Sequence, residues 1–145
     1  MQKPQNTLSS WNVFVLRHQK TPNIIFHVIS CLLFWLSVPV AFLIKQPYLA
    51  AGFFLSGLVG TLGHFLFKDG SVNRREATSS LQVVHYSTKM VVMFLAGRYQ
   101  TQILEAKVKF QSYLAGEISS DCSKAEIAEK LGEDSFYEQK SHAAL

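Results

Sequence analysis

The sequence predicts an all-α integral membrane protein, with a helical hairpin, one or two amphipathic or shallowly inserted helices, and a polar acidic tail. Three observations predict this class. Two long stretches without a charged residue follow one another, apolar residues then continue at helical spacing, and only 17% of the 145 residues are charged. Soluble domains carry about 25% charged residues, so this composition argues against a disordered chain. The length allows a single domain.

The two charge-free stretches are long enough to cross a bilayer. Residues 24–44 and 48–67 hold 21 and 20 residues without Asp, Glu, Lys or Arg. A helix of about 20 apolar residues spans the hydrocarbon core. Two buried helices of a soluble core are the alternative, but a chain of this size rarely hides two adjacent stretches of this kind. Only Lys45, Gln46 and Pro47 separate the stretches, so a tight helical hairpin is predicted.

Basic residues set the predicted orientation of the hairpin. Lys45 stands alone at the turn, whereas the opposite end of the hairpin carries Lys3, Arg17, Lys20, Lys68, Arg74 and Arg75. The positive-inside rule therefore places the N-terminus and residues 68–80 on the cytoplasmic side. The membranes expected for such a protein are the bacterial inner membrane and the endoplasmic reticulum. Because basic residues punctuate apolar stretches, the net charge of +4 indicates a membrane surface as partner and no nucleic acid.

The chain after the second stretch predicts helices of a different kind. Residues 81–96 are mostly apolar, but Lys89 near their centre makes them a poor membrane span. Residues 97–114 continue the apolar pattern with charged residues interleaved. We expect one or two amphipathic helices at the cytoplasmic interface, or a shallow third insertion.

Charge divides the chain into two parts. Residues 1–115, the predicted membrane helical domain, carry eleven basic and three acidic residues, whereas residues 116–145 carry three basic and seven acidic ones. The second part is therefore predicted to be a polar acidic tail. Within it, Ser123 followed by Glu126 predicts a capped short helix over residues 125–131.

Small residues recur every four positions along the second stretch, at Gly52, Ser56 and Gly60, and the row ends at His64. On a helix this spacing forms one stripe, which allows another membrane helix to approach closely. The residues of the first stretch predicted to face it are His27, Cys31, Phe34 and Val38. The same stripe is also a candidate contact for a homo-oligomer, through Gly52, Ser56 and Gly60.

Four histidines are predicted to gather near the cytoplasmic end of the hairpin. His27 and His64 each lie about one helical turn inside that end, so they share a depth. His18 precedes the first stretch, and His85 follows the loop on the same side. Ionisable groups at membrane depth are rare and usually functional, and neutral imidazole is the commonest metal ligand. These four residues therefore form a candidate metal site, against the alternative that each bonds a backbone carbonyl or a lipid headgroup.

Charged residues near the histidines extend the candidate site. Asp69 and Glu76 are the nearby carboxylates, and a two-histidine, one-carboxylate iron site would recruit one of them. The candidate substrate-binding residues are Lys68, Arg74 and Arg75, because basic groups at the interface attract an anionic headgroup or carboxylate. The alternative is that these three residues only determine topology. The sequence contains no nucleophile elbow, phosphate-binding loop or dinucleotide fingerprint.

Four short motifs resemble a known family of membrane proteins. They are Trp11-x2-Phe-Val-x-Arg-His18, the spacing His18-x8-His27 with Pro22 between, Gly63-His64-Phe65-x-Phe67, and Phe94-Leu95-Ala96-Gly97-Arg98. Together they resemble the small multi-helix membrane proteins typified by the fungal endoplasmic-reticulum 2-hydroxy fatty acid dioxygenase, which have bacterial relatives. The resemblance covers roughly residues 11–99 and leaves the tail outside.

The resemblance implies an Fe(II)-dependent dioxygenase that shortens 2-hydroxy fatty acids by one carbon, with histidines holding the iron. His18, His27 and His64 match the family's histidines by position, and His85 has no counterpart.

The sequence departs from the family pattern at two places. Gln19 and Lys20 stand where a further histidine is usual, and residues 68–72 lack the Glu and Pro of a Glu-Lys-x-Arg-Pro run. Asp69 is the candidate substitute for that Glu. The alternative function is a non-enzymatic membrane module or adaptor that has lost the metal site.

Overall fold

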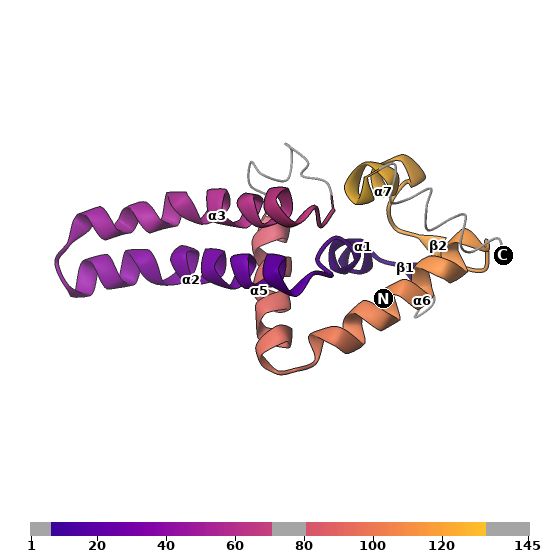
Figure 1. The fold of residues 1–145 in the computed structure, drawn as a ribbon, viewed down its shortest axis with the longest axis horizontal. Helices are drawn as coiled ribbons and strands as arrows, with labels where there is room; N and C mark the ends of the chain where they lie inside the picture. Colours follow the sequence, from indigo (N-terminus) through magenta and orange to yellow (C-terminus); the bar gives the residue numbers. More distant parts are fainter. Residues whose placement is uncertain (1–6, 71–80, 133–145) are drawn as a thin grey trace.

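The computed structural model describes residues 7–70 and 81–132, which are mostly helical (Figure 1). The helices in this part of the chain are α1 (Ser10–Leu16), α2 (Thr21–Leu43), α3 (Ala51–Phe67), α5 (Leu81–Leu95), α6 (Tyr99–Leu114) and α7 (Lys124–Leu131). A 3-10 helix, η1 (Pro47–Ala50), connects α2 to α3. Two short strands, β1 (Thr7–Leu8) and β2 (Ser119–Ser120), pair in parallel. The predicted all-α class is confirmed.

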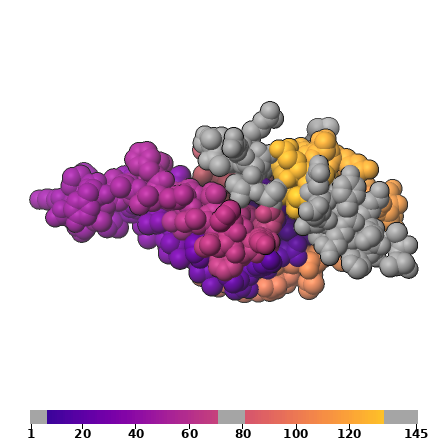
Figure 2. Space-filling model, turned by 45° about the horizontal axis from the view of Figure 1, so that its top comes forward, coloured from indigo at the N-terminus to yellow at the C-terminus, as the bar shows by residue number. Residues whose placement is uncertain are grey.

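The predicted hairpin is formed by α2 and α3, which lie side by side and extend away from the rest of the molecule (Figure 1; Figure 2). The chain turns at Lys45, whose φ of 56° is left-handed. Among the described residues, Thr21–Leu43 and Pro47–Phe67 are the helical segments long and apolar enough to cross a membrane. Phe42 and Phe54 are among the large apolar side chains exposed along them. An apolar surface of this extent fits lipid better than water.

The small-residue stripe of α3 lets the two helices approach closely. A Cβ on Gly52 would lie 2.9 Å from the Cβ of Ser37, and a Cβ on Gly60 would lie 3.3 Å from the Oγ of Ser30. The Ser30 hydroxyl donates to the carbonyl oxygen of Ser56 at 2.7 Å. The stripe therefore joins two helices of one chain. Because α2 already covers Gly52, Ser56 and Gly60, they do not offer the surface that the predicted homo-oligomer contact requires.

The face of α2 that meets α3 differs in part from the predicted one. His27 faces α3, and the Phe34 ring packs on a phenylalanine of α3 at 4.8 Å between centroids. The prediction was wrong for Val38, which is half exposed, and Cys31 lies near Thr88 of α5. Seven residues make nearly two helical turns, so the facing row repeats every seven residues, at Asn23, Ser30 and Ser37.

Helix α5 crosses the hairpin at a steep angle (Figure 1). The Trp35 indole N–H of α2 donates to the Thr88 hydroxyl of α5 at 3.1 Å. One face of α5 buries Met90, whereas Leu81 and Val92 are exposed on the other. Helix α5 therefore has the two-sided character predicted for residues 81–96.

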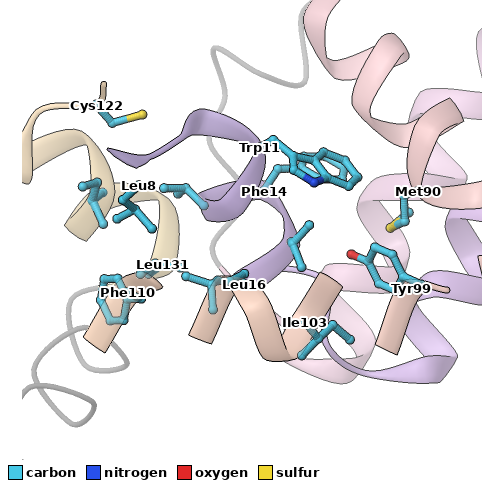
Figure 3. Packing of buried hydrophobic residues seen from close by; sticks show 14 of the residues in the cluster. Leu8, Trp11, Phe14, Leu16, Met90, Tyr99, Ile103, Phe110, Cys122 and Leu131 are labelled. Atoms are coloured by element: carbon cyan, nitrogen blue, oxygen red, sulfur yellow. The ribbon is translucent and has the colours of Figure 1, made fainter. Parts of the chain in front are cut away.

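A hydrophobic core joins the N-terminal segment to α6 and α7 (Figure 3). Leu8, Tyr99, Phe110 and Ile127 are among its fully buried side chains. The Trp11 indole N–H donates to the side-chain oxygen of Gln102 and so ties α1 to α6. This core fixes α1 against α6 at the root of the hairpin, where α1 ends and α2 begins.

Part of the predicted acidic tail belongs to this core. Ser123 caps α7 as predicted, because its hydroxyl accepts the backbone N–H of Glu126 at 3.2 Å. Strand β2 pairs with β1, and the cluster includes Cys122, Ile127 and Leu131. The segment from β2 to the end of α7 thus packs onto the first helix, and residues 133–145 lie outside the described part of the chain.

Candidate metal centre

Three of the predicted histidines converge at the root of the hairpin. His18 follows α1, His27 lies in the second turn of α2, and His64 lies in the last turn of α3. The Nε2 atom of His27 lies 3.1 Å from that of His18 and 3.1 Å from that of His64. One ring nitrogen from each residue lies within 4.8 Å of the others, close enough to bind one metal ion. His27 and His64 thus meet across the hairpin, and their depth in a membrane stays a prediction.

Backbone carbonyls orient two of the three rings. The Nδ1 of His18 lies 2.6 Å from the carbonyl oxygen of Phe14, and the Nδ1 of His64 contacts the carbonyl oxygen of Asp69. The side-chain amide of Asn23 is also near the His64 Nδ1, but at the longer distance of 3.5 Å. Because a carbonyl only accepts, each Nδ1 carries the proton and donates it, which leaves the Nε2 lone pair directed at the other rings.

The three inner nitrogens point toward one another across the hairpin. The Nε2 atoms of His18 and His64 both present lone pairs to His27 Nε2. A neutral His27 offers at most one proton at that nitrogen, so it can donate toward only one partner. A metal ion would accept all three lone pairs. A second ring nitrogen that donates to a backbone carbonyl is also the arrangement usual for metal-binding histidines. The residues present therefore fit a metal.

Burial keeps the first histidine neutral. His18 is only 1% exposed, and its ring stacks on that of Phe14 with centroids 4.1 Å apart. Burial lowers the pKa of His18 well below its usual value, and the nearby His27, His64 and Arg17 lower it further. An imidazole binds a metal only in its neutral form, and burial keeps His18 in that form.

Local sequence explains the placement of the rings. The Ser9 hydroxyl accepts the N–H of Asn12, and the Asn12 side chain accepts the N–H of Ser9, which together begin α1. Pro22 stands in the first turn of α2, where its missing N–H costs nothing. Lys68 ends α3 in a left-handed conformation, with φ of 48°, and turns the chain back toward the start of α2.

Asp69 does not join the histidines as a ligand in this arrangement. Its carboxylate accepts hydrogen bonds from the backbone N–H groups of Gln19 and Lys20 and from the side chain of Asn23. The group of residues close enough to bind a metal, within the described chain, consists of the three histidines. Asp69 therefore does not supply the carboxylate of the predicted two-histidine, one-carboxylate site, and Glu76 lies outside the described residues.

The other predicted site residues do not join the three histidines within the described chain. His85 is exposed on α5, where its ring neighbours Tyr86 at 5.8 Å between centroids. Lys68 is exposed beside the centre at the end of α3. Arg74 and Arg75 fall among the residues that the structure does not describe.

Two residues at the site were not predicted from the sequence. Asn23 is fully buried one turn before His27, and this four-residue spacing on one helix face was the available signal. Tyr99 is also buried, and its hydroxyl donates to the backbone carbonyl of His18 at 3.1 Å. Burial raises the pKa of Tyr99 far above its usual value, so the phenol stays protonated. No local pattern links Tyr99 to His18, which is 81 residues earlier.

Comparisons with protein-family models, curated proteins and solved structures gave no match.

Proposed function

We propose that this protein is a membrane-bound, Fe(II)-dependent dioxygenase that shortens 2-hydroxy fatty acids by one carbon. The observation that carries the proposal is the convergence of His18, His27 and His64, whose ring nitrogens lie within 4.8 Å of one another. The reaction is inferred from the motifs that resemble the 2-hydroxy fatty acid dioxygenase family. The three histidines are the proposed ligands of its iron.

The donor set supports a metal of the first transition row. Imidazole nitrogens suit iron, zinc, copper and nickel, and three protein ligands leave positions for other molecules. Bound iron would supply the electron transfer that dioxygen chemistry requires. The protein's own contribution is to hold His18 and His64 through the carbonyls of Phe14 and Asp69, and to keep the rings out of water.

The position of the centre supports action at the polar end of a lipid. The three rings lie at the root of the hairpin, where Lys20 and Lys68 are exposed, while the apolar surface extends toward Lys45. An acyl chain that lies along this surface would bring its carboxyl end to the root. Lys68 would attract that carboxylate, together with Arg74 and Arg75, in agreement with a cytoplasmic root and the positive-inside rule.

The reaction balances with dioxygen as the only oxidant. A 2-hydroxy fatty acid and one molecule of O₂ give the fatty acid shortened by one carbon, carbon dioxide and water. The bond between the first two carbons breaks, and the hydroxyl-bearing carbon becomes the new carboxyl group. No further reductant is needed.

Metal analysis of the purified protein tests the proposal, with His27→Ala, His64→Ala and His85→Ala as variants. We expect iron in the wild-type protein and in His85→Ala, because His85 lies outside the group, and loss of iron in the other two. Incubation with a 2-hydroxy fatty acid and O₂, followed by mass spectrometry, should show the shortened acid only for the iron-containing proteins. A wild-type protein that binds no metal would end the proposal.

A non-enzymatic membrane module with a structural metal is the second candidate. It is favoured by the burial of the three histidines, which are 1%, 8% and 7% exposed, because a buried centre limits the approach of a substrate. On this alternative, a chelator lowers the melting temperature of the metal-loaded protein, but no shortened acid forms with any metal. Turnover that His27→Ala abolishes and His85→Ala retains would reject it.

A further inference from the structure

Asp69, just past the end of α3, makes hydrogen bonds through both its side chain and its backbone carbonyl. It is 5% exposed, and Lys68 before it adopts the left-handed conformation that turns the chain inward. Its carboxylate accepts the N–H of Lys20 at 2.8 Å, the N–H of Gln19 at 3.3 Å and the side-chain amide of Asn23 at 3.2 Å.

These donors lie at and just before the start of α2, and the side-chain amide of Asn23 lies in its first turn. Lys20 is the N-cap residue of α2, and its own side chain makes no capping hydrogen bond. The first N–H groups of a helix lack partners within the helix, and a negative charge there is favourable. The carboxylate that accepts the N–H of Lys20 comes from beyond the end of α3, so it joins the start of α2 to the end of α3 at the root of the hairpin.

The same residue contacts His64 through its backbone, since its carbonyl oxygen accepts the Nδ1–H of that ring. Its side chain holds Gln19 and Lys20, which directly follow His18, and Asn23, which lies one turn before His27. We infer that Asp69 is a positioning residue that sets the distances among the three metal-binding histidines, an inference that rests on the proposed metal site.

A role as a metal ligand fits these contacts less well. Both carboxylate oxygens already accept hydrogen bonds, and turning one of them to a metal would leave part-buried backbone N–H groups or the buried Asn23 amide without this partner. The Lys20 side chain also joins the start of α2 to the end of α3, because its ammonium donates to the carbonyl oxygens of Phe67 at 2.6 Å and Lys68 at 3.2 Å.

Titration with Co(II) of the full-length protein in detergent micelles tests the inference. Asp69→Ala keeps the peptide carbonyl and all three histidines but removes the carboxylate. We expect about 10- to 100-fold weaker Co(II) binding and a changed visible absorption spectrum of the bound ion, because residues that orient metal ligands contribute on this scale. Asp69→Asn should lose less affinity than Asp69→Ala, since its amide oxygen still accepts the N–H of Lys20.

Ser30→Ala is the matched control. It removes a hydrogen bond of 2.7 Å between α2 and α3 that involves no histidine. This variant should bind Co(II) with the wild-type affinity and spectrum even where its melting temperature falls. If Asp69→Ala does not fold, as judged by circular dichroism, Asp69→Asn carries the same test with a smaller expected loss.

The outcomes separate the inference from the proposed function. Wild-type protein that binds no Co(II) overturns the metal site itself. Wild-type binding that Asp69→Ala and Asp69→Asn both retain, with an unchanged spectrum, overturns the positioning role alone. If Ser30→Ala weakened Co(II) binding as much as Asp69→Ala, the positioning role would also be overturned, because the lost affinity would then come from general loosening of the hairpin.

Discussion

Gly63 precedes His64 on the α3 face that packs against α2. A Cβ at this position would lie 2.8 Å from the Cβ of Phe26 and against the side-chain oxygen of Asn23. Real side chains do not approach so closely, and packed helices cannot shift without moving their other contacts. The absence of a side chain at Gly63 thus permits the helix spacing that brings His64 to His27.

We expect Gly63→Ala to destabilise the protein by about 1–3 kcal/mol, the usual effect of overpacking. Gly57→Ala is the control, because nothing lies within 4 Å of a Cβ at Gly57. Replacing this exposed helical glycine should raise stability by about 0.5–1 kcal/mol. Thermal unfolding in detergent micelles measures both changes. A Gly63→Ala protein as stable as Gly57→Ala would show that α2 and α3 are not packed as described.

Counting residues from the same end of both hairpin helices predicted that His27 meets His64. No such count fixes the position of His85, which lies on α5 outside the hairpin. Depth follows from the helical rise per residue, so two residues near the same end of a hairpin have the same height. Where His85 points depends on how α5 crosses α2, and the contacts between these helices, such as that of Trp35 with Thr88, join residues 53 positions apart. His18 was placed correctly in the candidate site although its position depends on α1 and α6.

At the level of the elements, the short helix α7 shows what local pattern determines. Ser123 and the N–H of Glu126 form the predicted cap, which depends on residues three positions apart. The packing of α7 was not predicted, because the many acidic residues of the tail dominated its composition. Its buried residues, Ile127 and Leu131, stand four apart on one face, and this spacing was the signal for a packed helix.

Ile127→Ala tests whether α7 is part of the core. Ile127 is fully buried, so the truncation should cost about 2–5 kcal/mol of unfolding free energy. Lys124→Ala on the exposed side of the same helix should change stability by no more than about 0.5 kcal/mol. Urea denaturation followed by circular dichroism gives both values. Similar, small effects of the two variants would mean that α7 contributes little to the fold.

The whole molecule has two ends of opposite character. The hairpin, which extends away from the rest of the molecule (Figure 2), exposes apolar side chains along its length. The other end buries its apolar residues in the core shared by α1, α6 and α7 (Figure 3). The charge-free stretches predicted the first end. The second depends on contacts between the first and last parts of the described chain, such as β1 with β2, which no pattern in either segment specifies.

The two tryptophans of the chain report on these two ends separately. Trp35 lies on α2 and is 54% exposed, so in a bilayer its ring should contact lipid. Trp11 lies in the core, with its N–H donated to Gln102 and the Lys89 ammonium 4.1 Å from its ring centroid. In vesicles whose acyl chains carry bromine, a quencher that acts only at close range, we expect strong quenching of Trp35 and little of Trp11. Trp11→Phe and Trp35→Phe isolate the two signals, and unquenched Trp35 or quenching of Trp11 to the same extent would contradict the insertion of the hairpin into lipid.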